Sequence, residues 1–240
     1  MPTPRDPDLF LKSLADAFFH CTDKAPPQSV SKRNAQFFYA AKAASIARLI
    51  ALDRVLPEFE KLSNDARTLE RMFEEDQLLY EFFSHSYSLI ESFCFGAYFV
   101  GSQISPSHFD PDPNLRFINP RKTCNCFEQF DMNAGFTGAL RAVLDSKEHD
   151  AIDIRNLLSH RFSPGRIIRP MVDIHSWDLN MWFAGDWSNA GGGVGKPLPK
   201  KEFQIESKSL IELRDWSDQQ LELLGKELEN LATSKGLSQK

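Results

Sequence analysis

The sequence predicts an all-α fold in which the whole chain, residues 1–240, forms one domain. Two long runs, at 31–56 and 64–104, keep apolar residues three and four positions apart, which is the period of an amphipathic helix. A leucine stripe over 206–234 has the same period and can close a helical bundle. The composition, 42% hydrophobic and 25% charged, is that of an ordinary globular chain that can bury one large core.

The N-terminal half is predicted to hold three helices. A short opening helix covers 8–20, where apolar residues recur near the helical period. The second helix covers 31–56 and ends at Pro57, because proline lacks the N–H group that would continue the hydrogen-bond pattern. The third covers 64–104, contains no proline and has a break near Asp76. This third helix is the predicted central element of the fold.

The two most apolar stretches do not have the pattern of membrane spans. Lys42 and Arg48 interrupt the first, at 35–52, and neither stretch supplies the roughly 20 apolar residues that a span needs. Glu91 interrupts the second, at 86–101, and faces either a polar pocket or solvent. The opening residues MPTPRDPDLF do not resemble a secretory signal, and four unevenly spaced cysteines favour reduced thiols. We therefore expect a cytoplasmic protein that does not contact a membrane.

The middle of the chain is predicted to leave the helical bundle and return to it. Residues 105–128 hold four prolines together with turn-forming Asp and Asn, which indicates a long surface excursion. Two helices follow, at 133–145 and 147–162. Asp145 and Glu148 stand between them with the spacing of a capping box.

Residues 166–205 are predicted to be an insertion of mixed character, with a β-hairpin, before the closing helix. The segment is rich in aromatic residues and contains a glycine and lysine loop. Trp177, Trp182 and Trp187 recur every five residues. They either form a small satellite core or stack on unpaired bases of RNA.

Three short motifs resemble ligand sites but fail on their spacing. GGGVGK at 191–196 resembles a phosphate-binding loop, but Pro197 stands where a Ser or Thr belongs. CNC at 124–126 lacks the second Cys or His pair that a zinc site needs. HFDPD at 108–112 fits a proline-rich turn better than a cation site. We expect neither a metal nor a cofactor.

The segment RNLLSH places Arg155, Asn156 and His160 within an apolar, helical pattern. Histidine, with an ordinary pKa of about 6.5, can exchange a proton near neutral pH. Arginine stays charged, and its fork of donors can hold a phosphate group. Arg169 and His175 have a similar spacing, but a proline follows this arginine directly and the pattern around it is not helical.

RNLLSH resembles the motif of the HEPN superfamily (higher eukaryotes and prokaryotes nucleotide-binding), an arginine with a polar residue and a histidine four to six positions on. The resemblance implies a HEPN-like helical bundle and metal-independent cleavage of RNA to 2′,3′-cyclic phosphate and 5′-hydroxyl ends. It assigns catalysis to Arg155, Asn156 and His160, and it implies a homodimer with both motifs at the interface. A toxin or defence effector with a cognate inhibitor protein would fit such an activity.

Helix geometry independently favours a second copy at the site. Asn156 and His160 share one face, whereas Arg155 lies about 140° round the helix from His160 and about 7.5 Å along its axis. One helix therefore cannot easily assemble all three groups. The net charge of −5 excludes a broad basic surface for RNA, so the substrate would be held by a local group of cations, expected to be Arg161, Arg166 and Arg169.

Two other functions fit the same residues. The chain could be a catalytically silent HEPN-like module that binds nucleotide, RNA or a protein partner. It could also be a helical scaffold, in which Arg155 and Arg161 pair with Asp150 or Asp153 while His160 interacts with the C-terminal end of its helix.

Overall fold

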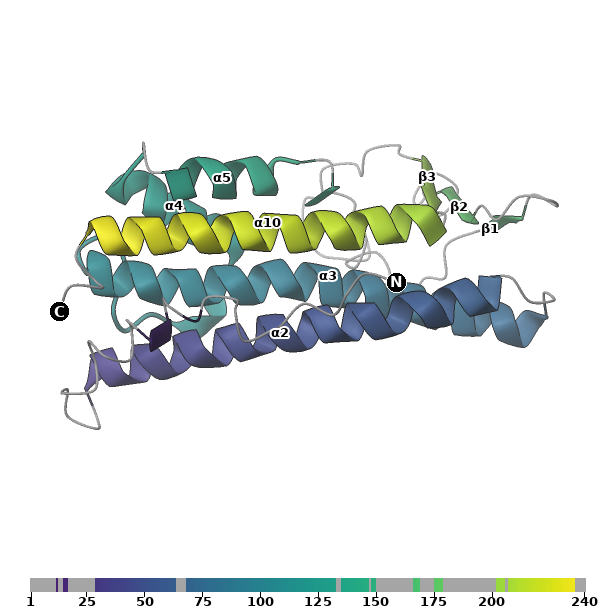
Figure 1. Cartoon of the computed structure of the whole chain (residues 1–240), viewed down its shortest axis with the longest axis horizontal. Coiled ribbons are helices and arrows are strands. Elements are labelled where there is room, and N and C mark those ends of the chain that lie inside the picture. Colours follow the sequence, from purple (N-terminus) through teal and green to yellow (C-terminus); the bar gives the residue numbers. More distant parts are fainter. Residues whose placement is uncertain are drawn as a thin grey trace, which may run out of the picture.

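The computed structural model describes residues 29–63, 68–132, 135–146, 148–149 and 207–235, three short strands between 166 and 205, and Lys12, Ala15 and Asp16. Long helices dominate this part of the chain, which confirms the all-α prediction at that level. Helices α2, α3 and α10 run side by side, and α4 and α5 lie on the side of α10 and α3 away from α2 (Figure 1). Among the described helices, none combines the length and apolar character needed to cross a bilayer.

Helix α2 spans Val30–Ser63 and continues through Pro57, so the predicted end at this proline is wrong. A proline inside a helix removes one hydrogen bond and costs about 3 kcal/mol. Val55 and Phe59 flank the proline and are each only 1% exposed. Burial of these two side chains against the rest of the bundle holds the helix together on both sides of Pro57.

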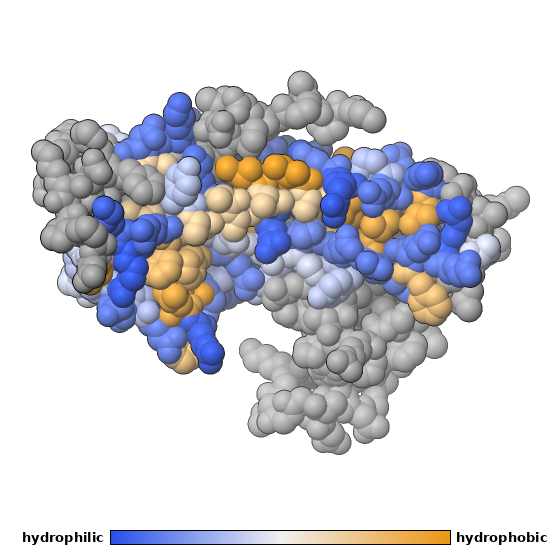
Figure 2. Space-filling model, turned by 90° about the horizontal axis from the view of Figure 1, so that it is seen from below, coloured by the Kyte–Doolittle hydropathy of each residue, from blue (hydrophilic) through white to orange (hydrophobic). Residues whose placement is uncertain are grey.

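The outer face of α2 is apolar over several turns. Tyr39 and Ile50 are 53% and 58% exposed, and Ala43 and Ala47 between them are also exposed. Figure 2 shows the molecule from the side of α2, where apolar residues run along the middle with hydrophilic residues on either side. The opposite face of the helix carries the core residues.

Helix α3 spans Leu69–Ile104 without the predicted break near Asp76. Its start lies later than predicted, because the Thr68 side chain accepts a hydrogen bond from the Arg71 amide at 3.3 Å and caps the helix. Residues 64–67 lie outside the described part. Leu79 is fully buried one turn beyond Asp76, and this packing keeps the helix continuous there.

The sequence predicted a surface excursion over 105–128, but the excursion is shorter than that. The excursion ends after a 3-10 turn, Leu115–Phe117, because helix α4 begins at Pro120 and spans Pro120–Phe130. The Asn119 side chain accepts a hydrogen bond from the Lys122 amide at 2.9 Å, and proline suits the first position of a helix. Phe109, inside the excursion, is fully buried and anchors it to the core.

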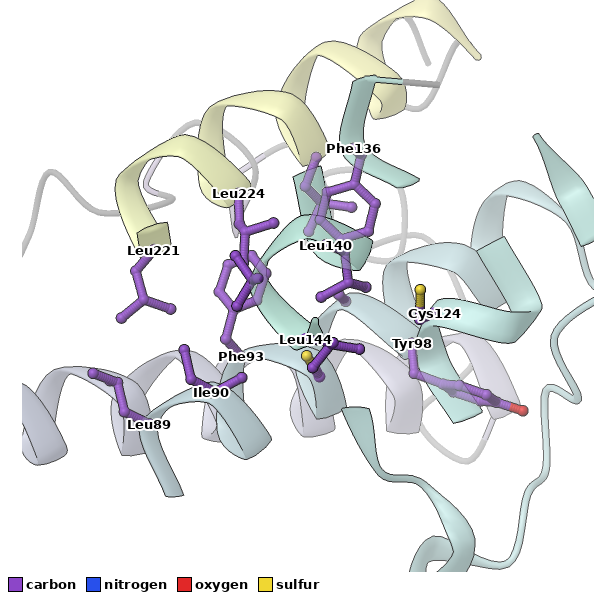
Figure 3. Packing of buried hydrophobic residues seen from close by; sticks show 14 of the residues in the cluster. Leu89, Ile90, Phe93, Tyr98, Cys124, Phe136, Leu140, Leu144, Leu221 and Leu224 are labelled. Atoms are coloured by element: carbon purple, nitrogen blue, oxygen red, sulfur yellow. The ribbon is translucent and has the colours of Figure 1, made fainter. Parts of the chain in front are cut away.

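The core joins α2, α3, α4, α5 and α10. Helix α5 spans Gly135–Leu144 and α10 spans Ser207–Ser234, close to the predicted 133–145 and 206–234. Figure 3 shows side chains of α3, α5 and α10 meeting in this core. The predicted leucine stripe of α10 is confirmed. Its fifth member, Leu213, packs against the core, and the other four are buried: Leu210, Leu224, Leu228 and Leu231.

The opening helix and the 166–205 segment are described only in part. Lys12, Ala15 and Asp16 are helical, and Ala15 belongs to the core. Strands β1 (Arg166–Ile168), β2 (His175–Asp178) and β3 (Glu202–Ile205) form an antiparallel sheet in the order β1-β2-β3.

Candidate functional site

Most of the predicted site residues lie outside the described part of the chain. These are the catalytic candidates Arg155, Asn156 and His160 and the substrate-binding candidates Arg161 and Arg169. Arg166 opens strand β1, where its backbone pairs with Trp177. Trp182 and Trp187 also lie outside the described residues. What the structure describes is the start of the segment that carries RNLLSH and the surface beside it.

The helix predicted at 147–162 begins with a different cap from the one expected. The Ser146 hydroxyl accepts a hydrogen bond from the His149 amide at 3.1 Å, and residues 148 and 149 are helical. A serine oxygen bonded to the amide three residues on is the usual geometry of an N-cap. Asp145, predicted as the cap, instead forms an ion pair with Arg121 at 3.3 Å. The cap is therefore Ser146, one residue after the Asp145 that the capping-box pattern indicates.

The first turn of this helix faces α3. The rings of His149 and Tyr87 lie with their centroids 6.2 Å apart. Glu91 is four residues further along α3 than Tyr87, hence near the same side of the helix, and is half-buried. The sequence left two alternatives for Glu91, a polar pocket or open solvent, and its partial burial matches neither of them fully.

A second group of basic residues lies on the flank of α3 that faces α2. Burial and the positive charges of Arg48 and Arg54 lower the pKa of His85, while the negative charge of Glu81 acts in the opposite direction. His85 is therefore mostly neutral at pH 7. No local pattern in the sequence indicates this group, because the arginines come from α2 and the histidine from α3.

A buried arginine joins α10 to α2 and has a structural role. Arg214 forms an ion pair with Asp53 at 2.7 Å, and also contacts Asp215 at 3.1 Å and Asp218 at 3.5 Å. Burial alone lowers the pKa of Arg214, but these carboxylates outweigh it and raise the pKa. The guanidinium is held within its own helix and by α2, and it is only 10% exposed.

The cysteines of the CNC segment belong to the core. Cys124 and Cys126 are 4% and 3% exposed, and neither forms a disulfide. Burial, with the neighbouring carboxylate of Glu128, raises the pKa of the Cys124 thiol to about 12. Burial also raises the pKa of Cys94. Within the described residues, no three side chains of the metal-binding types lie together as a metal site.

The HFDPD segment forms a turn, as predicted. Asp110 accepts a hydrogen bond from the Asp112 amide at 2.9 Å, and Asp112 pairs with Arg33 at 2.7 Å. The His108 ring lies 2.8 Å from the Ser105 hydroxyl. These contacts close the turn and fix it to the start of α2.

The pair Arg169 and His175 does not share a helix. His175 opens strand β2, where its backbone pairs with Ile168 and Ile205, while Arg169 lies outside the described residues. His175 therefore lies in a strand, whereas the described residues that follow Ser146 are helical.

Comparisons of the chain with protein-family models, with curated proteins and with solved structures find no match.

Proposed function

We propose that the protein is a metal-independent endoribonuclease of the HEPN type. The observation that carries the proposal is the segment RNLLSH at 155–160, in a stretch whose pattern is helical. Two features of the described chain support it. The fold is a bundle of long helices, and a helix begins after Ser146 with its first turn against Tyr87 of α3. The proposed biological role is that of a toxin or defence effector.

The proposed chemistry begins at the ribose 2′-hydroxyl. His160 takes the proton from this hydroxyl as its oxygen attacks the adjacent phosphorus, or gives a proton to the departing 5′-oxygen. The new bond is that between the 2′-oxygen and phosphorus, and the bond that breaks is that between phosphorus and the 5′-oxygen. The products are therefore a 2′,3′-cyclic phosphate and a 5′-hydroxyl.

Arg155 and Asn156 act on the phosphate during this step. The guanidinium of Arg155 keeps its charge at all relevant pH values and stabilises the extra negative charge of five-coordinate phosphorus. Asn156 orients the phosphate or the imidazole of His160 by hydrogen bonds. Three further cations hold the rest of the strand: Arg161, Arg166 and Arg169.

The active form in this proposal is a homodimer. Arg155 and His160 point about 140° apart on one helix, so a site that contains both groups is completed by the same helix of a second copy. Each composite site then takes its arginine from one copy and its histidine from the other.

RNA cleavage in excess EDTA tests the proposal. The expected result is cleavage of an RNA substrate to cyclic phosphate ends, with no cleavage when the scissile nucleotide carries deoxyribose. Cleavage that requires a divalent metal, or that also cuts DNA, would contradict the mechanism. Tight RNA binding without cleavage would make the protein a silent HEPN-like binding module instead.

A further inference from the structure

We infer that residues 115–122 form a binding surface for an unpaired RNA strand. The choice of RNA as ligand rests on the proposed function, whereas the surface itself is defined by the described structure. It comprises the 3-10 turn and the first turn of α4, and its side chains are those of Leu115, Arg116, Phe117, Arg121 and Lys122. We call it the 115–122 surface.

The aromatic residue of this surface projects into solvent from a fixed turn. Phe117 is 69% exposed, although a phenyl ring is usually buried. The turn is held by Asn114, whose side chain accepts a hydrogen bond from the Arg116 amide at 3.2 Å and whose carbonyl accepts one from the Phe117 amide at 3.0 Å. A ring that is already held outward can stack on a base without the cost of ordering the loop.

No acidic residue lies among the three cations of the surface in the sequence. Residues 113–127 contain Arg116, Arg121 and Lys122 and no Asp or Glu. The acids that flank this stretch are each paired elsewhere: Asp112 with Arg33 at 2.7 Å, and Glu128 with Arg141 at 2.7 Å. The local field is therefore positive at Arg116 and Lys122 in a chain whose net charge is −5, whereas Asp145 partly offsets the charge of Arg121.

Two of the cations stand where they disfavour the helix. Arg121 and Lys122 lie in the first turn of α4, which has no acidic residue. Cations at this positive end of a helix cost a few tenths to about 1 kcal/mol each, so the charges of these residues do not stabilise the start of α4. An anion bound beside them would offset this cost. Arg121 gains only an exposed ion pair with Asp145 in return, and residues that break a local rule are expected chiefly at functional surfaces.

The surface lies next to residues 146, 148 and 149, the described start of the segment that is predicted to carry RNLLSH on a helix. Arg121 reaches Asp145 at 3.3 Å, and Asp145 immediately precedes the Ser146 cap. The two side chains are 72% and 55% exposed, so this ion pair is weak and a phosphate can replace the carboxylate. A strand bound on the 115–122 surface would therefore pass beside the helix proposed to cut it.

An unpaired strand fits this surface better than a lipid bilayer does. One ring beside three cations matches one base with its neighbouring phosphates. A bilayer interface would require a larger apolar face, and besides Phe117 the surface offers only Leu115, which is 40% exposed.

Binding of a strand that cannot be cleaved tests the inference. The probe is a fluorescein-labelled 12-nucleotide 2′-O-methyluridine, whose blocked 2′-oxygen prevents attack on the phosphate, and the measurement is fluorescence anisotropy on the full chain. Phe117→Ala should weaken binding by about 5- to 150-fold, the usual effect of losing one stacking residue. Arg116→Gln and Lys122→Gln should each lower the slope of log affinity against log salt by about 0.7.

Met132→Ala is the matched control. Met132 is 69% exposed, as Phe117 is, and it follows the opposite end of α4, about 15 Å along the helix from Pro120. This variant should bind the probe as the parent does. Equal losses in both variants, or unchanged binding by Phe117→Ala, would overturn the inference. Phe117-dependent binding to phosphatidylserine vesicles with no binding to the probe would also overturn it.

The outcome is separable from that of the proposed function. His160→Ala should abolish cleavage of ordinary RNA, and adding Phe117→Ala to this variant should weaken probe binding by the same factor as in the parent. If the parent binds the probe through Phe117 but cuts no RNA, the 115–122 surface is supported and the nuclease proposal fails. If the parent cuts RNA but Phe117→Ala binds and cuts as the parent does, the nuclease proposal stands and the surface is wrong.

Discussion

The ring of Phe109 packs directly on Gly101 in the last turn of α3. A Cβ atom added at Gly101 would lie 2.5 Å from the nearest carbon of that ring, which is closer than two carbon atoms can approach. The ring is fixed from the other side, since its centroid is 4.6 Å from that of Phe127 in α4. The segment between α3 and α4 is thus anchored by one side chain that requires a glycine beneath it.

Gly101→Ala should therefore destabilise the protein. Alanine favours the helix by up to about 1 kcal/mol, but overpacking in a core typically costs about 1–3 kcal/mol, and the buried ring cannot move without losing its contact with Phe127. The expected net result is a lower midpoint of unfolding in urea. Gly138→Ala is the control, because Gly138 lies in α5 with no atom near its added Cβ, and this variant should be as stable as the parent or more so. A rise in midpoint for both variants would contradict the packing described.

The Cys124 thiol should resist alkylation in the folded protein. Its pKa is raised to about 12, and only the thiolate reacts, so at pH 8 the reaction with iodoacetamide should be at least about a thousandfold slower than that of a free thiol. As long as the pH is below this pKa, the thiolate fraction grows about tenfold for each unit by which the pH rises. Peptide mapping by mass spectrometry gives the labelling rate of each cysteine, and the urea-unfolded protein provides the reference. Equal rates in the folded and unfolded protein would show that Cys124 is not buried.

The helices that the sequence predicted well are those whose limits follow from local chemistry. The closing helix was placed correctly because its leucines recur at the helical period. Pro57 and Pro120 show where local chemistry is insufficient. The same residue type lies inside α2 and begins α4, and the difference depends on burial of Phe59 in one case and on the Asn119 cap in the other. A cap can be found from sequence, but burial depends on distant partners.

The candidate site shows the same division. Arg155, Asn156 and His160 were selected for their chemistry and spacing, which are properties of one short segment. The contact between Tyr87 and His149 joins residues 62 positions apart, and no local pattern predicts it. The 115–122 surface could have been found from the sequence as an acid-free stretch with three cations around a phenylalanine. Its significance depends on the exposure of Phe117, which only the structure gives.

A composite site predicts a dimer that can be complemented. Light scattering at micromolar concentration should give twice the 27.3 kDa mass of one chain. Arg155→Ala and His160→Ala should each be inactive alone. When the two variants are unfolded and refolded together, each mixed dimer regains one site with both groups, so about a quarter of the parent activity should return. A monomer that cleaves RNA, or a mixture that stays inactive while mixed dimers are present, would defeat the composite site.

The last prediction is that Arg155 and His160 act as one unit. Loss of a general acid or base typically lowers the rate by about 10² to 10⁴, and residues that serve one transition state are strongly non-additive. His160→Ala and Arg155→Ala should therefore each nearly abolish cleavage, and the double variant should be scarcely worse than either. Asn156→Ala should have a smaller effect. Single-turnover rates with excess enzyme measure all four variants.

Two histidines elsewhere in the chain provide the controls for this prediction. His175→Ala changes strand β2, and His85→Ala changes the group near Arg48 and Arg54, so both should cleave RNA as the parent does. The Arg155 and His160 variants should retain the helical circular dichroism and melt within a few degrees of the parent, because a polar site contributes little to the core. Unfolding of these variants would show that the two residues are structural. Loss of cleavage in His85→Ala with retention in His160→Ala would move the catalytic site to the flank of α3 that faces α2.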